Sequence, residues 1–323
     1  MSKSVRIYET GSVDVLKLED ITIEKPLRNM VRVRHVFAGL NFIDVNQRKG
    51  FYPLKNLPKT LGMEASGIIE SVGEGVKKFK VGDRVSHCMN IGSYSELMNV
   101  NENKLIKIPD KLSLSMAAAS TLQGLTAHYL INDSYKVNKG DYVLIHSAAG
   151  GVGQILSQWV SLKGGVAVGT VGNKNKITTA RVCGCEHVIL YEEENFDREV
   201  LDITKGIGAK VIYDSVGKST FNRNLNCLSN KGSIVSYGNS SGAIEPFDLS
   251  TLRPKSASIV SGGLLNYISN YDELSSRASD LFSEIIKGSI KINVNDDYTI
   301  NDIKEAHRAL ESRETTGSIV MSL

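Results

Sequence analysis

The sequence predicts an α/β chain in which a barrel-like antiparallel part accompanies a doubly wound parallel sheet. Three observations predict it. Short strand patterns separated by glycine turns fill residues 1–123. Strand and helix patterns alternate over residues 124–262, which is typical of a parallel sheet with helices on both faces. The first strand and helix of this alternation flank a glycine-rich turn at 146–153, the usual start of such a sheet.

Length, composition and charge exclude several classes of protein. The 323 residues are enough for two ordinary domains, and 41% hydrophobic with 23% charged residues is the composition of a globular protein. A net charge of +3 is too small to indicate nucleic acid or a membrane as a partner. No apolar run reaches the roughly 18–20 residues of a membrane helix, and the N-terminus lacks a signal-peptide core. Four cysteines make no dense disulfide framework, so we expect reduced thiols and a cytoplasmic location.

The first part, residues 1–123, is predicted from short strands. Met30–Phe37 alternates apolar and charged side chains, as a strand with one buried face does. Ala65–Val72 predicts a second strand, and Lys80–Val85 predicts a turn that leads into a third. Several short strands joined by glycine turns favour an antiparallel, barrel-like domain.

The glycine-rich turn indicates the ligand class of the middle part. Ala148, Gly150 and Gly153 have the spacing of the G-x-G-x-x-G pattern, with alanine in the first place. Glycine lets the main chain come close to a pyrophosphate, and the N-terminus of the following helix supplies free N–H groups and partial positive charge. The turn therefore predicts dinucleotide binding.

The middle part, residues 124–262, alternates between strand and helix patterns. Six strands are expected, the number in a complete dinucleotide domain. They are Tyr142–Ser147, Val166–Val171, His187–Tyr191, Ala209–Asp214, Ser233–Tyr237 and Ser258–Ser261. The helices expected between them are Val152–Leu162, Asn175–Val182, Phe196–Thr204 and Thr220–Leu228.

The last part, residues 263–323, is predicted to join the first, so that the middle part is an insertion. A long helix begins at a capping box of Asn270 with Glu273 and ends at Gly288. Its apolar stripe consists of Leu274, Ala278, Leu281, Phe282, Ile285 and Ile286. The elements expected after it are a strand Ile290–Val294, a helix Asn301–Ser312 and a strand Ser318–Met321.

A series of motifs in order resembles the zinc-independent quinone oxidoreductases, the zeta-crystallin group of the medium-chain dehydrogenase/reductase superfamily. These motifs are Ala38–Asp44, Gly50–Pro53, Gly62–Gly67, Val81–Val85, Ala117–Ala119, His146–Gly153, Asp214–Gly217 and Tyr237–Gly242. The resemblance covers essentially the whole chain. It implies a GroES-like catalytic domain (1–123 and 263–323) and a Rossmann domain (124–262) for NADPH. It also implies a homodimer that reduces small quinones.

The positions that carry catalytic zinc in related alcohol dehydrogenases hold other residue types here. They match Asn41, Met63 and about Leu122, none of which is a good zinc ligand. The region of the structural zinc has only Cys88. The one close pair, Cys183-x-Cys185, is interpreted as two small core residues. We therefore expect no zinc.

The segment after the second strand of the middle part favours NADPH over NADH. Where NAD-binding proteins carry an acidic residue for the ribose, this chain has no carboxylate and two lysines, Lys174 and Lys176. Ammonium groups attract a 2′-phosphate, although two lysines also suit an ordinary solvated helix start. The resemblance places this phosphate near Gly172, Lys176, Tyr191 and Arg313. Packing alone explains Tyr191 equally well.

The resemblance implies the remaining cofactor contacts and four residues beside the nicotinamide. The other cofactor residues are Ala149, Gly150, Gly151, Val152, Val216, Tyr237, Asn239, Ser240 and Leu264. The four residues of the catalytic side are Asn41, Tyr52, Asp44 and Gln123. An amide and a phenol donate hydrogen bonds, which suffices for a quinone because a quinone accepts hydride readily. Structural roles remain open: Asn41 in a turn, Asp44 as a helix cap, and Glu64 as a buried partner.

The sequence is compatible with three functions. The first is NADPH-dependent quinone reduction; Asn46 and Gln123 depart from close relatives and put the preferred substrate in question. The second is reduction of α,β-unsaturated carbonyl compounds, with Tyr52 as proton donor. The third is an RNA-binding or crystallin-like structural role, for which no basic and aromatic platform is visible. A homodimer would join through the strand Ser258–Ser261. His87, His128 and His307 are expected to be packing or surface residues.

Overall fold

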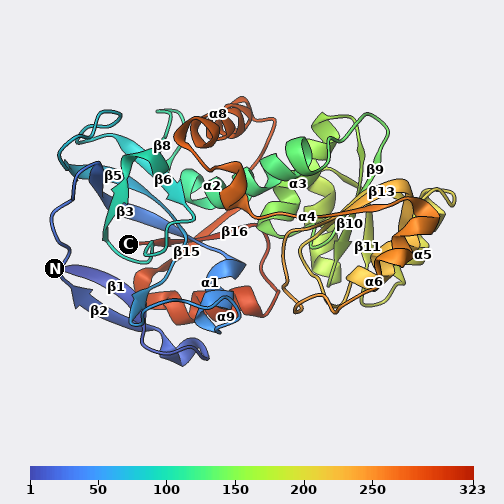
Figure 1. The fold of residues 1–323 in the computed structure, drawn as a ribbon, viewed down its shortest axis with the longest axis horizontal. Coiled ribbons are helices and arrows are strands. Elements are labelled where there is room, and N and C mark those ends of the chain that lie inside the picture. Colours follow the sequence, from blue (N-terminus) through green and yellow to red (C-terminus); the bar gives the residue numbers. More distant parts are fainter. The chain divides into compact units, whose positions relative to one another are not determined.

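The computed structural model describes residues 1–323, and the chain divides into two compact units (Figure 1). Unit 1 comprises Met1–Leu125, Tyr267–Ile286 and Ile292–Leu323. Unit 2 comprises Thr126–Asn266 and Lys287–Lys291. Unit 1 thus combines the beginning and the end of the chain.

Unit 1 is built from two β-sheets. The larger sheet has the order β15-β16-β3-β5-β6-β8, with β7 also paired to β3, and the smaller has the order β2-β1-β4. Their bounds are β1 Ser2–Ile7, β2 Lys17–Ile21, β3 Met30–Leu40, β4 Lys59–Thr60, β5 Glu64–Val72, β6 Arg84–Cys88, β7 Leu97–Asn101, β8 Ile106–Lys107, β15 Val294–Thr299 and β16 Ser318–Ser322. The alternation predicted for Met30–Phe37 is confirmed as far as His35, since Val31, Val33 and His35 are buried, whereas Phe37, after a register shift, is only half-buried.

Four helices accompany these sheets: α1 Phe42–Arg48, α2 Leu114–Tyr129, α8 Tyr271–Lys287 and α9 Ile303–Glu311. The sequence did not predict α2, which extends into unit 2, because nearly every face of it is buried and no polar stripe marks a helical period. The stripe predicted for α8 is buried except at Ile286, which is 38% exposed. Gly288, with φ of +77°, follows α8 as expected.

The strand predicted at Ile290–Val294 is wrong. β15 begins only at Val294 and continues through polar residues to Thr299. It is the edge strand of its sheet and pairs with β16 alone, and none of its residues is fully buried, so no apolar alternation marks it. Ile290 is buried without belonging to a strand.

Unit 2 is a six-stranded sheet with the order β11-β10-β9-β12-β13-β14, and every strand pair in it is parallel. This is the strand order of a doubly wound dinucleotide domain, which confirms the predicted fold class. The strands are β9 Tyr142–Ile145, β10 Val166–Val171, β11 Cys185–Leu190, β12 Ala209–Asp214, β13 Leu228–Ser236 and β14 Ser258–Ser261. The helices are α3 Gly151–Leu162, α4 Ile177–Val182, α5 Phe196–Ile203, α6 Phe221–Cys227 and α7 Leu264–Tyr267.

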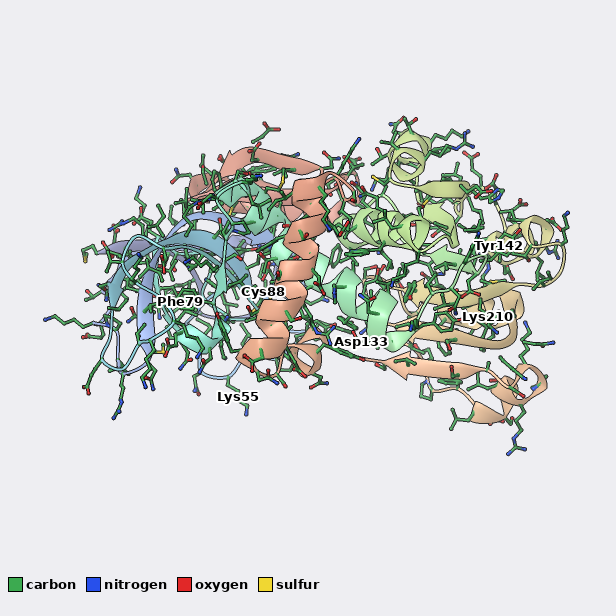
Figure 2. All side chains as sticks on the ribbon, turned by 90° about the horizontal axis from the view of Figure 1, so that it is seen from above. Lys55, Phe79, Cys88, Asp133, Tyr142 and Lys210 are labelled. Atoms are coloured by element: carbon green, nitrogen blue, oxygen red, sulfur yellow. The ribbon has the colours of Figure 1, made fainter.

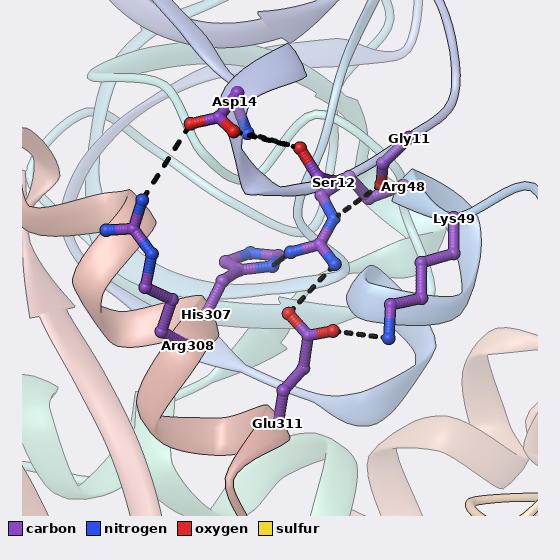
Figure 3. A network of polar contacts seen from close by, with 8 residues as sticks. All are labelled: Gly11, Ser12, Asp14, Arg48, Lys49, His307, Arg308 and Glu311. Carbon is purple, nitrogen blue, oxygen red and sulfur yellow. Dashed lines mark hydrogen bonds and ion pairs between the residues drawn. The ribbon is translucent and has the colours of Figure 1, made fainter.

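One fully buried cation ties separate segments of unit 1 together (Figure 3). The Arg48 guanidinium donates to the carbonyl of Gly11 at 3.2 Å, contacts Nδ1 of His307 at 3.2 Å and pairs with Glu311 at 2.8 Å. Glu311 also pairs with Lys49. These contacts fasten α9, near the end of the chain, to α1 and to the turn at residue 11.

No helix of this structure combines the length and the apolar character needed to cross a bilayer.

Candidate active site

The glycine-rich turn of unit 2 leaves the start of α3 open. Gly150 precedes α3 and has no side chain to cap it, so the first N–H groups of the helix have no side-chain partner there. A Cβ on Gly153 would lie 2.3 Å from the carbonyl oxygen of Ser147, so only glycine allows this approach of helix and turn. The turn offers free donors at a helix N-terminus, which suits a pyrophosphate.

Two further loops of unit 2 are joined at the carboxyl ends of β12 and β13. The N–H of Tyr237 donates to Asp214, and that of Ser240 donates to Ser215. The Asp214 carboxylate accepts the N–H of Val216 at 2.7 Å and of Gly217 at 3.0 Å. The predicted residues Val216, Tyr237, Asn239 and Ser240 therefore lie in one pair of linked loops.

A buried group of side chains supports these loops, and we call it the Asp214 cluster: Asp214, Asn224, His146 and Thr170. Asn224 donates to Asp214 at 2.7 Å, and its Oδ1 accepts from Nε2 of His146 at 2.7 Å. Nδ1 of His146 lies 3.0 Å from the hydroxyl of Thr170. Thr220 also donates to Asp214, at 2.8 Å. The cluster connects the carboxyl ends of β9, β10 and β12, where ligands bind in such sheets.

The segment after β10 has the electrostatic character predicted for a phosphate. A Cβ on Gly172 would lie 3.0 Å from the hydroxyl of Tyr191, so these two predicted residues are neighbours. Lys174 pairs with Glu193 at 3.1 Å on the surface, whereas Lys176 is half-buried. Of the other two predicted cofactor residues, Leu264 begins α7 and is buried in unit 2, and Arg313 belongs to unit 1.

The residues predicted for the catalytic side lie in unit 1, around the start of α1. The N–H of Asn41 donates to the Asp44 carboxylate at 2.8 Å, as in a capping box, and the Tyr94 hydroxyl donates to the same oxygen at 2.9 Å. Burial raises the pKa of Asp44 to about 7. Asp44 therefore anchors the main chain of Asn41 and lies in an environment that disfavours its charged form.

The side chains of Ser318, Gln123, Asn41 and Glu64 form a buried series of hydrogen bonds, which we call the amide chain. Ser318 donates to Oε1 of Gln123, and Nε2 of Gln123 donates to Oδ1 of Asn41 at 3.3 Å. Nδ2 of Asn41 donates to Oε2 of Glu64 at 2.8 Å. Burial, with a smaller contribution from the nearby charge of Asp44, raises the pKa of Glu64 to about 8.

Tyr52 differs from its neighbours because its hydroxyl group makes no hydrogen bond within the protein. Its position comes from the main chain, where its N–H donates to the carbonyl of Asn46 at 3.1 Å. The side chain is half-buried, and its ring lies 5.3 Å from that of Phe51, centre to centre. A phenol without a protein partner is available to donate to a ligand.

The positions that match zinc ligands in related dehydrogenases do not form a zinc site. Asn41 and the N–H of Leu122 both contact Glu64, and the sulfur of Met63 accepts from Gln47 at 3.4 Å. An amide, a thioether and an aliphatic side chain are poor ligands for zinc. No group of three or more His, Cys, Asp or Glu residues suited to a metal occurs in the structure.

The cysteines are buried and serve packing. Cys88, labelled in Figure 2, lies on β6 opposite Glu64, and burial raises the pKa of its thiol. Cys183 and Cys185 are also buried, with the Cys185 sulfur 3.2 Å from the hydroxyl of Ser157. Their pKa values are raised by burial, so these thiols stay protonated.

The three histidines expected to be packing or surface residues are all buried. Nε2 of His87 lies 2.9 Å from Nε2 of His35, and His307 contacts Arg48. The His128 ring packs edge-on to Trp159 at 6.1 Å. None of them lies in the amide chain.

Sequence reasoning missed the partners that hold the predicted residues in place. Ser318 is 195 positions from Gln123, and Tyr94 is 50 positions from Asp44. Spacing along the chain carries no signal for such contacts. The resemblance also gave Glu64 only an open structural role.

Both parts of the chain match known protein families. Residues 151–280 match the family model described as zinc-binding dehydrogenase, and residues 28–110 match that of the alcohol dehydrogenase GroES-like domain. Quinone oxidoreductase 1 of Escherichia coli is 39% identical over 99% of both chains. A 2-haloacrylate reductase of a Burkholderia species is 37% identical over 98% of this chain and 97% of its own.

A solved structure agrees with the sequence relatives. The crystal structure of Escherichia coli quinone oxidoreductase complexed with NADPH has a TM-score of 0.97 and 39% identity, and the match covers 99% of this chain and 100% of that chain. The chain belongs to the quinone oxidoreductases, an oxidoreductase family of the medium-chain dehydrogenase/reductase superfamily, as its motifs predict.

Proposed function

We propose that this protein is an NADPH-dependent quinone reductase that works without zinc. The observation that supports the proposal is the donor set of unit 1: two amides and a free phenol, which the resemblance assigns to the side of the nicotinamide. The family supports it, because relatives that match nearly the whole chain are quinone oxidoreductases and one of them was solved with NADPH.

The residues of unit 2 suit the cofactor. The open start of α3 would take the pyrophosphate, and the loops around Val216 and Tyr237 would flank the rest of the dinucleotide. Lys176 and Tyr191 would take the 2′-phosphate. NADPH supplies a hydride at C4 of its nicotinamide, and the protein supplies position and exclusion of water.

The residues of unit 1 suit the acceptor. Negative charge grows on a quinone oxygen as the ring carbon system takes up hydride, and donors aimed at that oxygen lower the barrier. Asn41 and Gln123 each keep one amide N–H without a protein partner, and Tyr52 keeps its hydroxyl. Asp44 holds the main chain of Asn41 in place.

The test follows NADPH oxidation at the nicotinamide absorbance under anaerobic conditions. The acceptors are 1,4-benzoquinone, a larger ortho-quinone and a 2-alkenal, with NADH as the cofactor control. We expect quinone turnover with NADPH and little with NADH. A Lys176→Ala variant should lose roughly tenfold in NADPH affinity and nothing in NADH affinity. NADPH binding without turnover of any quinone would refute the proposal.

Reduction of an activated double bond is the second candidate, favoured by the relative named 2-haloacrylate reductase. Hydride would then attack the β-carbon, and a proton would be needed at the α-carbon or at the oxygen. The free hydroxyl of Tyr52 is the donor that this reaction would use. Turnover of the 2-alkenal alone in the same assay would favour this function over the first.

The proposed enzyme is a homodimer joined through β14. This strand ends the parallel sheet of unit 2 and has a neighbour on one side only. Ile259 and Val260 on it are half-buried, and an edge of this kind pairs readily with a second chain. Sedimentation velocity should give twice the mass of the chain, whereas a monomer at micromolar concentration would contradict this arrangement.

A further inference from the structure

Glu64 contacts the side-chain amide of Asn41, and the hydride transfer described above gives it no role. It is fully buried on β5, where Oε1 accepts the N–H of Leu122 at 2.5 Å and Oε2 contacts the Asn41 amide at 2.8 Å. A Cβ on Gly39 would lie 2.6 Å from Oε2, so a glycine makes room for the carboxyl group. One oxygen of Glu64 is therefore fixed on the main chain and the other on a side-chain amide.

Each donor must face an acceptor, and this requirement, starting at Glu64, fixes the orientation of both side-chain amides. A main-chain N–H can only donate, so Oε1 of Glu64 must accept. When Glu64 is ionised, Oε2 accepts as well, and Nδ2 of Asn41 has to face it. Oδ1 of Asn41 then faces Gln123, which must present Nε2. Every hydrogen bond of the amide chain in the structure has this direction, with Ser318 as the first donor.

A proton on Glu64 reverses which residue donates and which accepts in each hydrogen bond of the amide chain. On Oε1 it would collide with the N–H of Leu122, so it resides on Oε2 and donates to Oδ1 of Asn41. Nδ2 of Asn41 then donates to Gln123, and Gln123 donates to Ser318. In either direction each amide keeps one N–H, and both residues retain slight exposure, 5% for Asn41 and 8% for Gln123.

The two directions differ in how well they stabilise an anion. In the ionised form a carboxylate lies one amide away from the oxygen on which negative charge grows, and the repulsion is poorly screened inside the protein. In the protonated form this charge is gone. The Asn41 carbonyl then also accepts from a carboxylic acid instead of an amide N–H, and this stronger donor polarises the N–H groups of the same amide and makes them better donors.

We propose that Glu64 is a positioning residue whose proton sets the direction of the amide chain, and that the protonated form holds Asn41 and Gln123 as the better donors for the acceptor oxygen. The inference rests on the proposed function. It adds a role for a residue that does not touch substrate or cofactor.

The surroundings of Glu64 put this switch within reach of ordinary pH. Burial raises its pKa to about 8. The titratable groups that face it are Asp44 on α1, Cys88 on β6 and Tyr94. The thiol and the phenol stay neutral because burial raises their pKa values too, and the charge of Asp44 adds to the upward shift of Glu64.

The variant Glu64→Gln tests the proposal because it locks one direction. The Leu122 N–H holds the oxygen of the introduced amide, so its NH₂ group faces Oδ1 of Asn41 at every pH, as the protonated acid does. We expect kcat of the unmodified protein to fall, relative to the variant, as pH rises through about 8. The variant should be roughly tenfold faster at about pH 9.5 and within about twofold at pH 6.5. NADPH affinity, from its fluorescence, should be equal in the two proteins.

Glu102→Gln is the matched control. Glu102 is also a buried glutamate of unit 1, and it accepts the N–H groups of Lys77 and Lys78, which do not belong to the amide chain. Its variant should keep the pH profile of the unmodified protein. A profile that changes in the same way in both variants would overturn the proposal.

A second measurement needs no turnover. 4-Nitrophenol, whose ionised form is yellow, is titrated into the NADP⁺-loaded protein at about pH 9.5, where the phenolate imitates the charged acceptor oxygen. We expect roughly tenfold tighter phenolate binding to Glu64→Gln than to the unmodified protein. Equal affinity would overturn the inference.

The outcomes separate this inference from the proposed function. If quinone is reduced but the pH profiles of the unmodified protein and Glu64→Gln coincide, or differ by one constant factor, the inference fails and the function stands. If no quinone is reduced, the proposed function fails, and the phenolate titration still decides whether Glu64 orients the amides.

Discussion

The two units each bury a series of polar side chains that ends on a carboxyl group, and the two series differ in what the carboxyl group holds. In the Asp214 cluster, Asp214 accepts four hydrogen bonds, two of them from main-chain N–H groups. In the amide chain, Glu64 contacts the side-chain amide of Asn41 as well as the main-chain N–H groups of Leu122 and Thr121. Asp214 therefore fixes a loop, whereas Glu64 orients side chains.

The two series also differ in whether their remaining amide N–H groups are exposed. Asn224 keeps one N–H beyond its bond to Asp214, as Asn41 does beyond its bond to Glu64. Asn224 is fully buried, so no ligand meets that N–H. Asn41 and Gln123 retain some exposure. A buried polar series is thus structural or functional according to whether its leftover donors reach a surface, which hydrogen-bond partners alone do not reveal.

Removing the carboxyl group of the Asp214 cluster should have the largest effect. Asp214→Ala leaves four donors without an acceptor, two of them in the main chain, and should lower the free energy of unfolding by about 4 kcal/mol. Urea denaturation measures it. Asp202→Ala, at an exposed carboxylate of α5, is the control and should change little. A loss at Asp214 as small as at Asp202 would mean that the cluster does not hold the loop.

The pH dependence of stability should show the next effect, at Glu64. The folded protein raises the pKa of Glu64 from 4.5 to about 8, so between these values it keeps a proton that the unfolded chain has released. The stabilisation is complete below pH 4.5 and is lost as pH rises to 8. Relative to Glu64→Gln, the unmodified protein should lose about 1 kcal/mol per pH unit in this window. Urea denaturation at several pH values gives the free energy of unfolding of both proteins. If the two free energies change in parallel with pH, the pKa shift of Glu64 is contradicted.

Crowding the amide chain should have a moderate effect. A Cβ on Gly39 would lie 2.4 Å from the carbonyl of Ala118 and 2.6 Å from Oε2 of Glu64, so Gly39→Ala must displace the carboxyl group. We expect a loss of about 2 kcal/mol in stability and a fall in kcat, with unchanged NADPH affinity. Gly263→Ala, which like Gly39 lies outside the positive-φ region and has no atom within 4 Å of the added Cβ, is the control for stability. Unchanged kcat would show that Glu64 need not keep its place.

The smallest effect on stability is expected at Tyr52. Its hydroxyl has no protein partner, so Tyr52→Phe should alter the free energy of unfolding by less than about 0.5 kcal/mol. A fall in turnover without a fall in stability would place the hydroxyl on the ligand. Tyr94→Phe is the contrast, because the Tyr94 hydroxyl is buried on Asp44 and its loss should destabilise by about 1–2 kcal/mol.

How much the sequence predicts differs between the two units for a physical reason. In unit 2, strands buried on both faces alternate with helices, and the expected strands Val166–Val171, Ala209–Asp214 and Ser258–Ser261 match the structure from end to end. In unit 1, α2 has no polar face and β15 no apolar one, so neither shows a period.

The site shows the same division. Glycine spacing and the lysines after β10 predict a nucleotide pocket, because the residues that form it follow one another in short motifs. The amide chain joins residues 41, 64, 123 and 318, and only the folded sheet brings them together. The resemblance supplied Asn41 and Gln123, but neither spacing nor composition leads to Ser318.

The place of β16 in its sheet has a consequence for synthesis on the ribosome. β16 lies between β15 and β3, and its residues Ile319, Val320 and Met321 are almost completely buried. The sheet of unit 2 is complete once Ser261 has emerged, whereas β3 waits for a neighbour that is translated nearly three hundred residues later. Nascent chains should therefore acquire a protease-resistant middle first, and the loss of only the last six residues should leave the N-terminal third digestible.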